Sequence, residues 1–223
     1  MANLYEIRRE YTQGRLDEST AADHPMTQFH AWFEAMKATE PDEPTVMTLA
    51  SVDATGQPWQ RIVLLKSYDD AGFVFFTNYT SNKGQHFAAN PKGSMHFAWL
   101  MQERQVIVQG EIAQISREET EAYFRSRPRE SQLGAWASLQ SQPLDSRQVL
   151  VDRFAALQAQ YEGQDIPVPD HWGGYRLAPT RFEFWQGGEA RLHDRLVYLP
   201  EAVQAEMGEV AADRQWQRQR LNP

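Results

Sequence analysis

The sequence contains no cysteine, so disulfides, thiolate catalysis, iron–sulfur clusters and cysteine zinc sites are excluded. Long apolar runs are also missing, because the longest, at 97–101, is far shorter than the about 20 residues that a membrane helix needs. Positive charge is scarce: 22 lysines and arginines face 30 aspartates and glutamates, and the net charge is −8. That balance argues against general nucleic-acid binding but permits a small basic pocket for a phosphate group.

Several motifs of known chemistry are absent as well. No G-x-G-x-x-G, G-x-x-x-x-G-K-[ST], H-E-x-x-H or G-x-S-x-G pattern occurs. The six histidines, at positions 24, 30, 86, 96, 171 and 193, have no metal-ligand spacing, so we expect no metal site. The first ten residues, MANLYEIRRE, reach charged side chains at once and include no apolar core segment. We therefore expect no secretory signal and a cytoplasmic protein.

Residues 1–24 are polar and are expected to form a short helix or a flexible N-terminal arm, and the lack of a break in composition predicts a single domain at 25–223. Apolar residues at 29, 32, 33 and 36 predict a helix that begins at Pro25 and ends before Pro41. Further helices are predicted at 81–89, 116–127 and 146–161, with a short one after Pro128. Strands are predicted at 45–52, 58–68, 73–79, 94–100, 105–115, 174–177, 181–185 and 195–199. The segment 201–213 is loop-like or helical, and 214–221 is ambiguous. Strands at this spacing predict a mainly β protein with flanking helices, an antiparallel barrel or sandwich.

Three segments carry candidate site residues, and the first is the strand RIVLLK at 61–66. Its middle is apolar on both faces, which predicts a strand buried on both sides with Arg61 and Lys66 on opposite faces. The alternative is that both charges only reach solvent at the strand ends.

The second segment is YFRSRPRES at 123–131. Tyr123 and Arg127 are four residues apart and share one helical face, and Ser131 follows past the break at Pro128. Two hydroxyls and a guanidinium on one side can hold a phosphate monoester. The alternative is a solvated amphipathic helix.

The third segment is WQGGEARLHDR at 185–195. If the residues after the two glycines are extended, Arg191, His193 and Arg195 project from one face and repel each other unless an anion or an electron-rich ligand lies there. The alternative is a surface strand with salt bridges to Glu189 and Asp194. Together the three segments suggest one or two phosphate-bearing ligands, and neither the ligand nor the reaction follows from the residues alone.

These segments resemble the pyridoxamine 5'-phosphate oxidase family over nearly the whole chain. The motifs that carry the resemblance are IRREYTQG at 7–14, QRIVLLK at 60–66, FFTN at 75–78, ERQVIVQG at 103–110, YFRSRPRESQLGAWAS at 123–138, EFWQGGEARLHDR at 183–195 and RLNP at 220–223. The resemblance implies an FMN-binding split barrel, Greek-key-like and mainly antiparallel, assembled as a homodimer with FMN at the interface. It also implies oxidation of pyridoxamine and pyridoxine 5'-phosphates to pyridoxal 5'-phosphate in vitamin B6 metabolism. Dioxygen would be the acceptor, giving hydrogen peroxide, with ammonia released from the amine.

The resemblance also implies roles for individual residues. Arg61 and Lys83 would hold the FMN phosphate, and Trp185 and Arg195 would reach the flavin from the partner chain. The cofactor-binding residues expected are Arg61, Ile62, Val63, Leu64, Leu65, Lys66, Phe76, Thr77, Lys83, Gln105, Gln140, Ser141, Trp185 and Arg195. The substrate-binding residues expected are Arg8, Arg9, Glu10, Tyr11, Lys66, Tyr123, Arg127, Ser131, Arg191, Leu192 and His193. Of these, Arg191 and His193 are the catalytic candidates, and Arg8 to Tyr11 would form an arm that closes over the substrate.

One position departs from the family pattern. Many members have Arg-Lys where this chain has Asn82-Lys83, which removes one cation from the expected FMN phosphate site. Two other functions remain open. One is a split-barrel flavin reductase with another substrate, against which the motif at 123–131 argues. The other is a non-catalytic pyridoxal-phosphate carrier, against which Arg191 and His193 argue.

Overall fold

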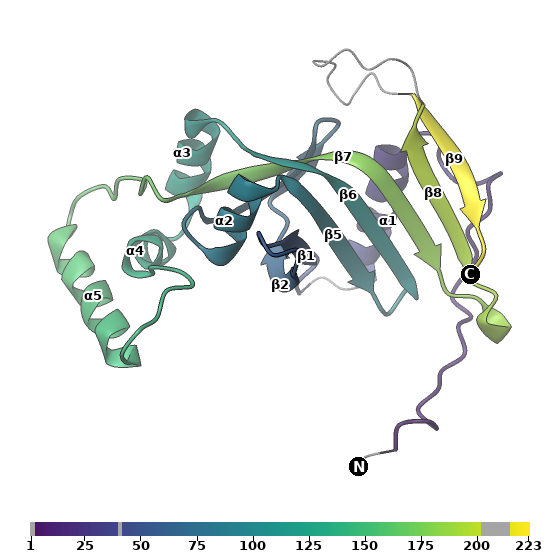
Figure 1. Ribbon diagram of the computed structural model, residues 1–223, viewed down its shortest axis with the longest axis horizontal. Coiled ribbons are helices and arrows are strands. Elements are labelled where there is room, and N and C mark those ends of the chain that lie inside the picture. The colour runs from purple at the N-terminus through teal and green to yellow at the C-terminus, as the bar shows by residue number, and fades with distance from the viewer. Residues whose placement is uncertain (1–2, 40–41, 202–214) are drawn as a thin grey trace.

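The computed structural model describes residues 3–39, 42–201 and 215–223, and an antiparallel sheet of nine strands dominates it (Figure 1). The strands are β1 (Val46–Val52), β2 (Pro58–Leu64), β3 (Ser67–Asp69), β4 (Gly72–Asn78), β5 (Lys92–Trp99), β6 (Arg104–Gln114), β7 (Trp172–Gln186), β8 (Asp194–Pro200) and β9 (Trp216–Leu221). The helices are α1 (Pro25–Thr39), α2 (Asn82–Ala89), α3 (Arg117–Ser126), α4 (Arg129–Ala137) and α5 (Arg147–Gln160), with a 3₁₀ turn η1 (Glu189–Arg191). The predicted class, antiparallel β with flanking helices, is confirmed.

Strand β7 determines how the sheet divides. The strand order is β2-β1-β5-β6-β7-β4-β3, with β8 on β7 and β9 on β8. One edge of β7 follows β6 over its length, whereas the other edge pairs with β4 up to Leu177 and with β8 from Phe182. The prediction of two separate strands at 174–177 and 181–185 is therefore wrong. The register shifts at Gly110, where an added Cβ would lie 2.0 Å from the carbonyl oxygen of Ala178, so this crossing needs glycine.

Helix α1 closes the core on one side of the sheet. Its predicted apolar face is confirmed, because Phe29, Trp32, Phe33 and Met36 are all buried. The ring of Phe29 packs edge-on against Phe73 of β4 with centroids 4.8 Å apart. Aromatic packing of this kind fixes the helix on the strands.

Strand β2 differs from its prediction. The segment 58–68 is not one central strand buried on both faces: β2 ends at Leu64 and forms an edge of the sheet. The side chain of Ile62 is 69% exposed and that of Leu64 is 41% exposed. Because β2 is an edge strand, Arg61 and Lys66 are not separated by a covered sheet, and both line the same cavity.

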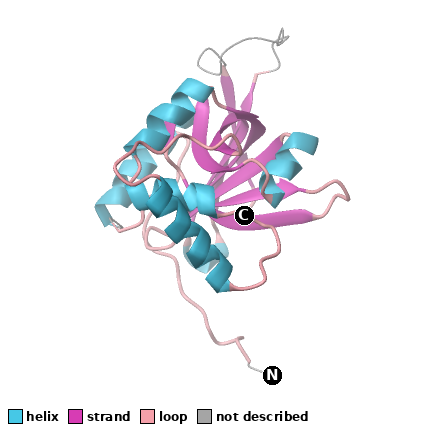
Figure 2. Ribbon diagram, turned by 90° about the vertical axis from the view of Figure 1, so that its left-hand side faces the viewer, coloured by secondary structure: helices cyan, strands magenta, loops and turns pink. Residues whose placement is uncertain are grey.

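Helices α3, α4 and α5 lie at one end of the molecule, and strands β8 and β9 lie at the other (Figure 1). The capping box that Ser116 and Glu119 predict is present at the start of α3. Helix α3 ends at Ser126, and α4 begins at Arg129 after Pro128, as the proline predicts. In the view turned by 90°, the helices surround the curved sheet and the N-terminal arm extends away from it (Figure 2).

The two remaining segments lie at the ends of the chain. Residues 3–24 contain no helix or strand, but Leu16 is 3% exposed and joins the core. The ambiguous segment at 214–221 forms β9 from Trp216 onward, whereas most of the acidic stretch 201–213 lies outside the described residues. Within the described ranges, no helix combines the length and apolar character needed to cross a bilayer.

Candidate active site

A cavity of about 950 Å³ opens between β2, β4, the start of α2, and helices α3 and α4. No acidic side chain is among the described residues that line it. Thirteen of the residues predicted from the sequence to bind cofactor or substrate meet here: Arg61, Ile62, Val63, Leu64, Lys66, Phe76, Thr77, Lys83, Tyr123, Arg127, Ser131, Gln140 and Ser141.

One part of the cavity wall is formed around a buried lysine, Lys83. The Lys83 ammonium donates to Thr77 Oγ1 at 3.0 Å, to Ser81 Oγ at 3.1 Å and to Gln140 Oε1 at 2.8 Å. Burial and the nearby charge of Arg61 lower the pKa of Lys83 to about 8. Two cations in a low-dielectric site destabilise each other, so an anion bound between them would be stabilised.

Helix α2 adds a positive helix end to this pole of the cavity. Ser81 caps the helix by accepting from the backbone N–H of Gly84, and Asn82, its first residue, lines the cavity. Helix N-termini attract anions through their unpaired N–H groups. Lys83, Arg61 and the start of α2 therefore form an anion-binding pole, named here the Lys83 pole.

A second group of rings and one guanidinium lines the same cavity and is named here the Arg127 pole. The Tyr123 ring stacks on Phe76 with centroids 3.8 Å apart, and Phe76 stacks on Trp172 at 5.4 Å. The Arg127 guanidinium lies 4.6 Å from the Trp172 ring centroid. Its buried Nη1 has no hydrogen-bond partner among the described residues. A buried donor without an acceptor costs stability, and the oxygens of an anion would satisfy it.

The loop between α3 and α4 explains how this pole forms. Arg127 is the C-terminal cap of α3, where the extended backbone turns the chain, and Ser131 returns to the same cavity on α4. Burial lowers the pKa of the Arg127 guanidinium and raises the pKa of Tyr123. Sequence reasoning did not identify Trp172 as part of this pole. Its position after a Pro-rich segment gives no local signal of a contact with α3.

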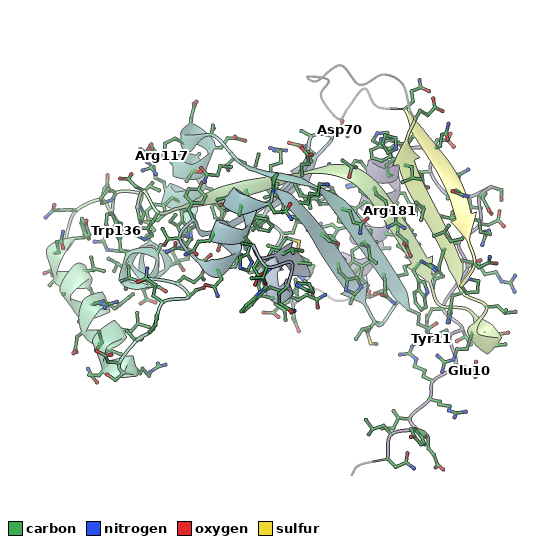
Figure 3. All side chains as sticks on the ribbon, in the orientation of Figure 1. Glu10, Tyr11, Asp70, Arg117, Trp136 and Arg181 are labelled. Carbon is green, nitrogen blue, oxygen red and sulfur yellow. The ribbon has the colours of Figure 1, made fainter. Side chains whose placement is uncertain are left out.

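A separate set of predicted residues gathers at the other end of the sheet, around the turn after β7. The Trp185 and His193 rings are 4.7 Å apart, and the Tyr11 ring lies 5.5 Å from His193 and 5.8 Å from Trp185. The Arg191 guanidinium lies 5.6 Å from the Tyr11 ring centroid. Figure 3 shows Tyr11 and Glu10 at the opposite end of the molecule from Trp136 on α4. Within one chain, the residues that line the cavity and the residues around the turn after β7 therefore lie far apart.

His193 has a defined tautomer when neutral. The backbone N–H of Gly188 donates to His193 Nδ1 at 3.1 Å, so Nδ1 is unprotonated and Nε2 carries the proton. Burial and the neighbouring Arg191 charge lower the pKa of His193, which keeps the ring neutral at pH 7. The ring nitrogen that can donate a hydrogen bond is therefore Nε2.

The predicted extended arrangement of 191–195 is wrong. Ala190 and Arg191 have φ values of 52° and 65°, and residues 189–191 form the turn η1, so β8 begins only at Asp194. The predicted repulsion is also relieved without a ligand at Arg195, because this guanidinium pairs with Glu183 at 2.7 Å. Burial alone would raise the pKa of Glu183, but hydrogen bonds from Arg181 and Arg195 hold it below its ordinary value. The pairing was missed because Glu183 lies on β7, which is adjacent to β8 only in the sheet.

The other predicted residues lie outside the cavity. Gln105 Oε1 lies 3.0 Å from His96 Nε2, and the Leu65 side chain is buried in the core. Leu192 is 74% exposed. Within the arm, Arg8 and Glu10 are exposed, and Arg9 pairs with Glu103. No group of three or more metal-ligating side chains occurs in the described part of the chain.

Comparisons with known proteins assign this chain to a family. Residues 33–161 match the family model described as pyridoxamine 5'-phosphate oxidase, and residues 172–223 match the pyridoxine 5'-phosphate oxidase C-terminal dimerisation region. A pyridoxine/pyridoxamine 5'-phosphate oxidase from Teredinibacter turnerae is 54% identical over 199 residues, covering 89% of this chain and 94% of the relative. One from Synechocystis sp. is 49% identical over 221 residues, covering 99% of this chain and 98% of the relative.

Two solved structures support the same fold. PhzG from Burkholderia lata, in complex with tetrahydrophenazine-1-carboxylic acid, has a TM-score of 0.83 and 27% identity, covering 93% of this chain and 98% of that one. A pyridoxamine 5'-phosphate oxidase-related, FMN-binding protein from Nostoc punctiforme has a TM-score of 0.68 at 14% identity, covering 90% and 98%. The predicted split-barrel fold is confirmed.

Proposed function

This chain belongs to the pyridoxamine 5'-phosphate oxidase family, and on that basis we propose that it is an FMN-dependent oxidase of vitamin B6 phosphates. The substrates are pyridoxamine and pyridoxine 5'-phosphates, and the product is pyridoxal 5'-phosphate. Dioxygen is reduced to hydrogen peroxide, and the amine substrate also consumes water and releases ammonia.

The observation that carries the proposal is one cavity lined by two groups of side chains suited to anions, the Lys83 pole and the Arg127 pole. The Lys83 pole and the Arg127 pole both belong to the cavity of about 950 Å³, and aromatic rings lie beside the Arg127 pole. A reaction between a phosphorylated cofactor and a phosphorylated substrate needs two phosphate sites that share one space. The pairing of these poles supports a cofactor and substrate that are both phosphate monoesters.

The residues of the Lys83 pole fit the FMN phosphate. The buried Lys83 ammonium, Arg61 and the start of α2 supply charge and donors to a group that is close to a dianion at neutral pH. Strand β2 lines the same cavity with Ile62, Val63 and Leu64. FMN held here would supply the hydride acceptor for the C4' carbon of the substrate and the route for its electrons to dioxygen.

The residues of the Arg127 pole fit the substrate phosphate. The unpaired Arg127 Nη1 donates to a phosphate oxygen. The hydroxyls of Tyr123 and Ser131 and the Lys66 ammonium also bind the phosphate. Holding the phosphate orients the pyridine ring in the cavity, which reduces the entropy cost of reaction.

His193 and Arg191 act on the substrate ring from the other side. Neutral His193 donates from Nε2 to the ring hydroxyl, and Arg191 supplies a positive charge at the same edge. Arg195, held by Glu183, would supply positive charge beside the cofactor and so favour its reduced form.

These last residues come from a second copy of the chain in this proposal. Trp185, Arg191, His193 and Arg195 fall within 172–223, the range that matches the family's dimerisation region. They do not line the cavity of their own chain. Strand β2 leaves Trp59, Ile62 and Leu64 exposed beside the cavity, which supports a second chain covering them, because grouped exposed apolar side chains mark interaction surfaces. The proposed assembly is a homodimer with two sites at the interface.

A visible spectrum of the purified protein tests the proposal. We expect a yellow homodimer with one FMN per chain, bleached by anaerobic pyridoxamine 5'-phosphate and restored by air. A colourless monomer that takes up no added FMN would refute the proposal. Binding of pyridoxal phosphate without bleaching by either reduced substrate would instead support the carrier function.

A further inference from the structure

Glu103 is a buried carboxylate that the proposed reaction does not use. It lies in the turn between β5 and β6 with a φ of 56°, and its side chain is 1% exposed. Its carboxylate accepts from Arg9 Nη2 at 2.8 Å and from the backbone N–H of Gln13 at 3.0 Å. Among the described residues, both donors therefore come from the N-terminal arm.

The backbone of Glu103 binds the end of β7. Its carbonyl oxygen accepts from the N–H of Gly187 at 2.7 Å and from Gln186 Nε2 at 3.3 Å. Glu103 thus joins two segments that are far apart in sequence, the arm and the turn that carries Arg191 and His193. With the left-handed backbone of Glu103, the carboxylate faces the arm and the carbonyl oxygen faces the turn after β7.

Tyr11 lies between the two arm residues that Glu103 holds. Its ring meets the Trp185 and His193 rings, and the Arg191 guanidinium covers it. An added Cβ at Gly187 would lie 2.8 Å from the Tyr11 Cβ, so glycine is what allows the arm to approach this closely. The position of Tyr11 therefore depends on both Glu103 and Gly187.

We propose that Glu103 is a positioning residue that latches the N-terminal arm and thereby holds Tyr11 against His193 and Arg191. Releasing the arm leaves a buried carboxylate without its donors, which is costly, so the docked arrangement is favoured. This inference rests on the proposed function, because it assumes that Arg191 and His193 contact the substrate. If only the docked arm gives a binding-competent site, the apparent substrate affinity falls in proportion to the docked fraction, while the turnover of the closed complex is unchanged.

Hydrogen–deuterium exchange and steady-state kinetics of the flavin-loaded dimer test the latch in Glu103→Gln, Arg9→Ala and the double variant. Arg9 is 54% exposed, so Arg9→Ala leaves the core intact even if Glu103→Gln folds poorly. We expect amide exchange within 9–13 to accelerate about tenfold in each variant and no further in the double variant. KM should rise about tenfold with kcat within about twofold. Glu34→Gln, which removes the partner of Lys37 on α1, is the control and should change neither measurement.

The outcomes separate the latch from the proposed function. Unchanged exchange in Glu103→Gln, or additive effects in the double variant, would overturn the latch. Faster exchange with an unchanged KM would overturn the positioning role. Faster, non-additive exchange in a protein that oxidises no vitamin B6 phosphate would support docking by Glu103 and refute the proposed function.

Discussion

The buried Lys83 makes the FMN-free protein less stable than it would be with an apolar side chain at this position. Burial and Arg61 lower the pKa of Lys83 from the ordinary lysine value of 10.5 to about 8, and the residue is 8% exposed. Each pKa unit corresponds to about 1.4 kcal/mol, so the charged form costs the folded state about 3 kcal/mol at pH 7. In the proposed function a bound phosphate offsets that cost, so Lys83 would contribute to binding at the expense of stability.

The sign of the pH dependence follows from the lowered pKa. Between pH 8 and pH 10.5 the unfolded chain holds the Lys83 proton and the folded chain does not, so the free energy of unfolding rises with pH there. Lys83→Met cannot show this rise. The stability of the variant relative to the native protein should therefore fall by about 2.5 kcal/mol from pH 7 to pH 10. The lost hydrogen bonds to Thr77, Ser81 and Gln140 shift all points equally and do not affect this difference.

Urea denaturation of the FMN-free protein at pH 7, 8, 9 and 10, followed by tryptophan fluorescence, measures this difference. Lys92→Met, at the exposed start of β5, is the matched control and should show no such trend. FMN titration should give a Kd for Lys83→Met that is about 10–100-fold weaker, because a charge-assisted hydrogen bond is lost. A stability difference that does not vary with pH would refute the reasoning, because it would mean that Lys83 is solvated in the FMN-free form.

Three further predictions concern the two poles and the interface. Asn82→Arg should tighten FMN binding several-fold, less so at high salt, with substrate KM unchanged; equal affinity in a titration would mean that residue 82 does not face the phosphate. Arg191→Ala and His193→Ala should retain FMN but lower kcat/KM by a factor of about 10²–10³, and unchanged kinetics would return both residues to a structural role. Mixing Lys83→Met and His193→Ala protomers should restore about a quarter of the native activity, since half of the dimers are mixed and each has one intact site. No recovery after verified subunit exchange would contradict a site shared between chains.

Local patterns in the sequence predict the elements of the fold whose partners lie in the same segment. The apolar face of α1 and the capping box of α3 depend on spacings of three or four residues, and both are present. The sequence predicts two strands, at 174–177 and 181–185, where the structure has the single strand β7. It continues because its register on β6 is set at Gly110, a residue about 70 positions away along the chain.

The candidate site divides in the same way. The sequence placed Tyr123, Arg127 and Ser131 together because one helix and its proline break bring them together locally. The salt bridge of Arg195 with Glu183 and the contact of Arg9 with Glu103 were not predictable, because both depend on strand pairing or on the path of the arm. Charge repulsion inferred from neighbours in the sequence can be removed by a carboxylate on an adjacent strand.

The wrong prediction for β2 has a physical cause that bears on the assembly. The run from Ile62 to Leu65 is apolar on both faces, a pattern that selection maintains when both faces are covered. In one chain only one face of β2 is covered, and Ile62, which lines the cavity, is 69% exposed. The other predicted site residues, around the turn after β7, lie at the far end of the same chain. A second copy placed over β2 would cover Ile62 and bring Trp185, Arg191 and His193 to the cavity in the same step. The proposed homodimer thus accounts for both the apolar edge strand and the separation of the site residues. Association of two chains and completion of the site are then one event, so a variant that weakens the interface, such as Ile62→Asp, would lose dimer and activity together.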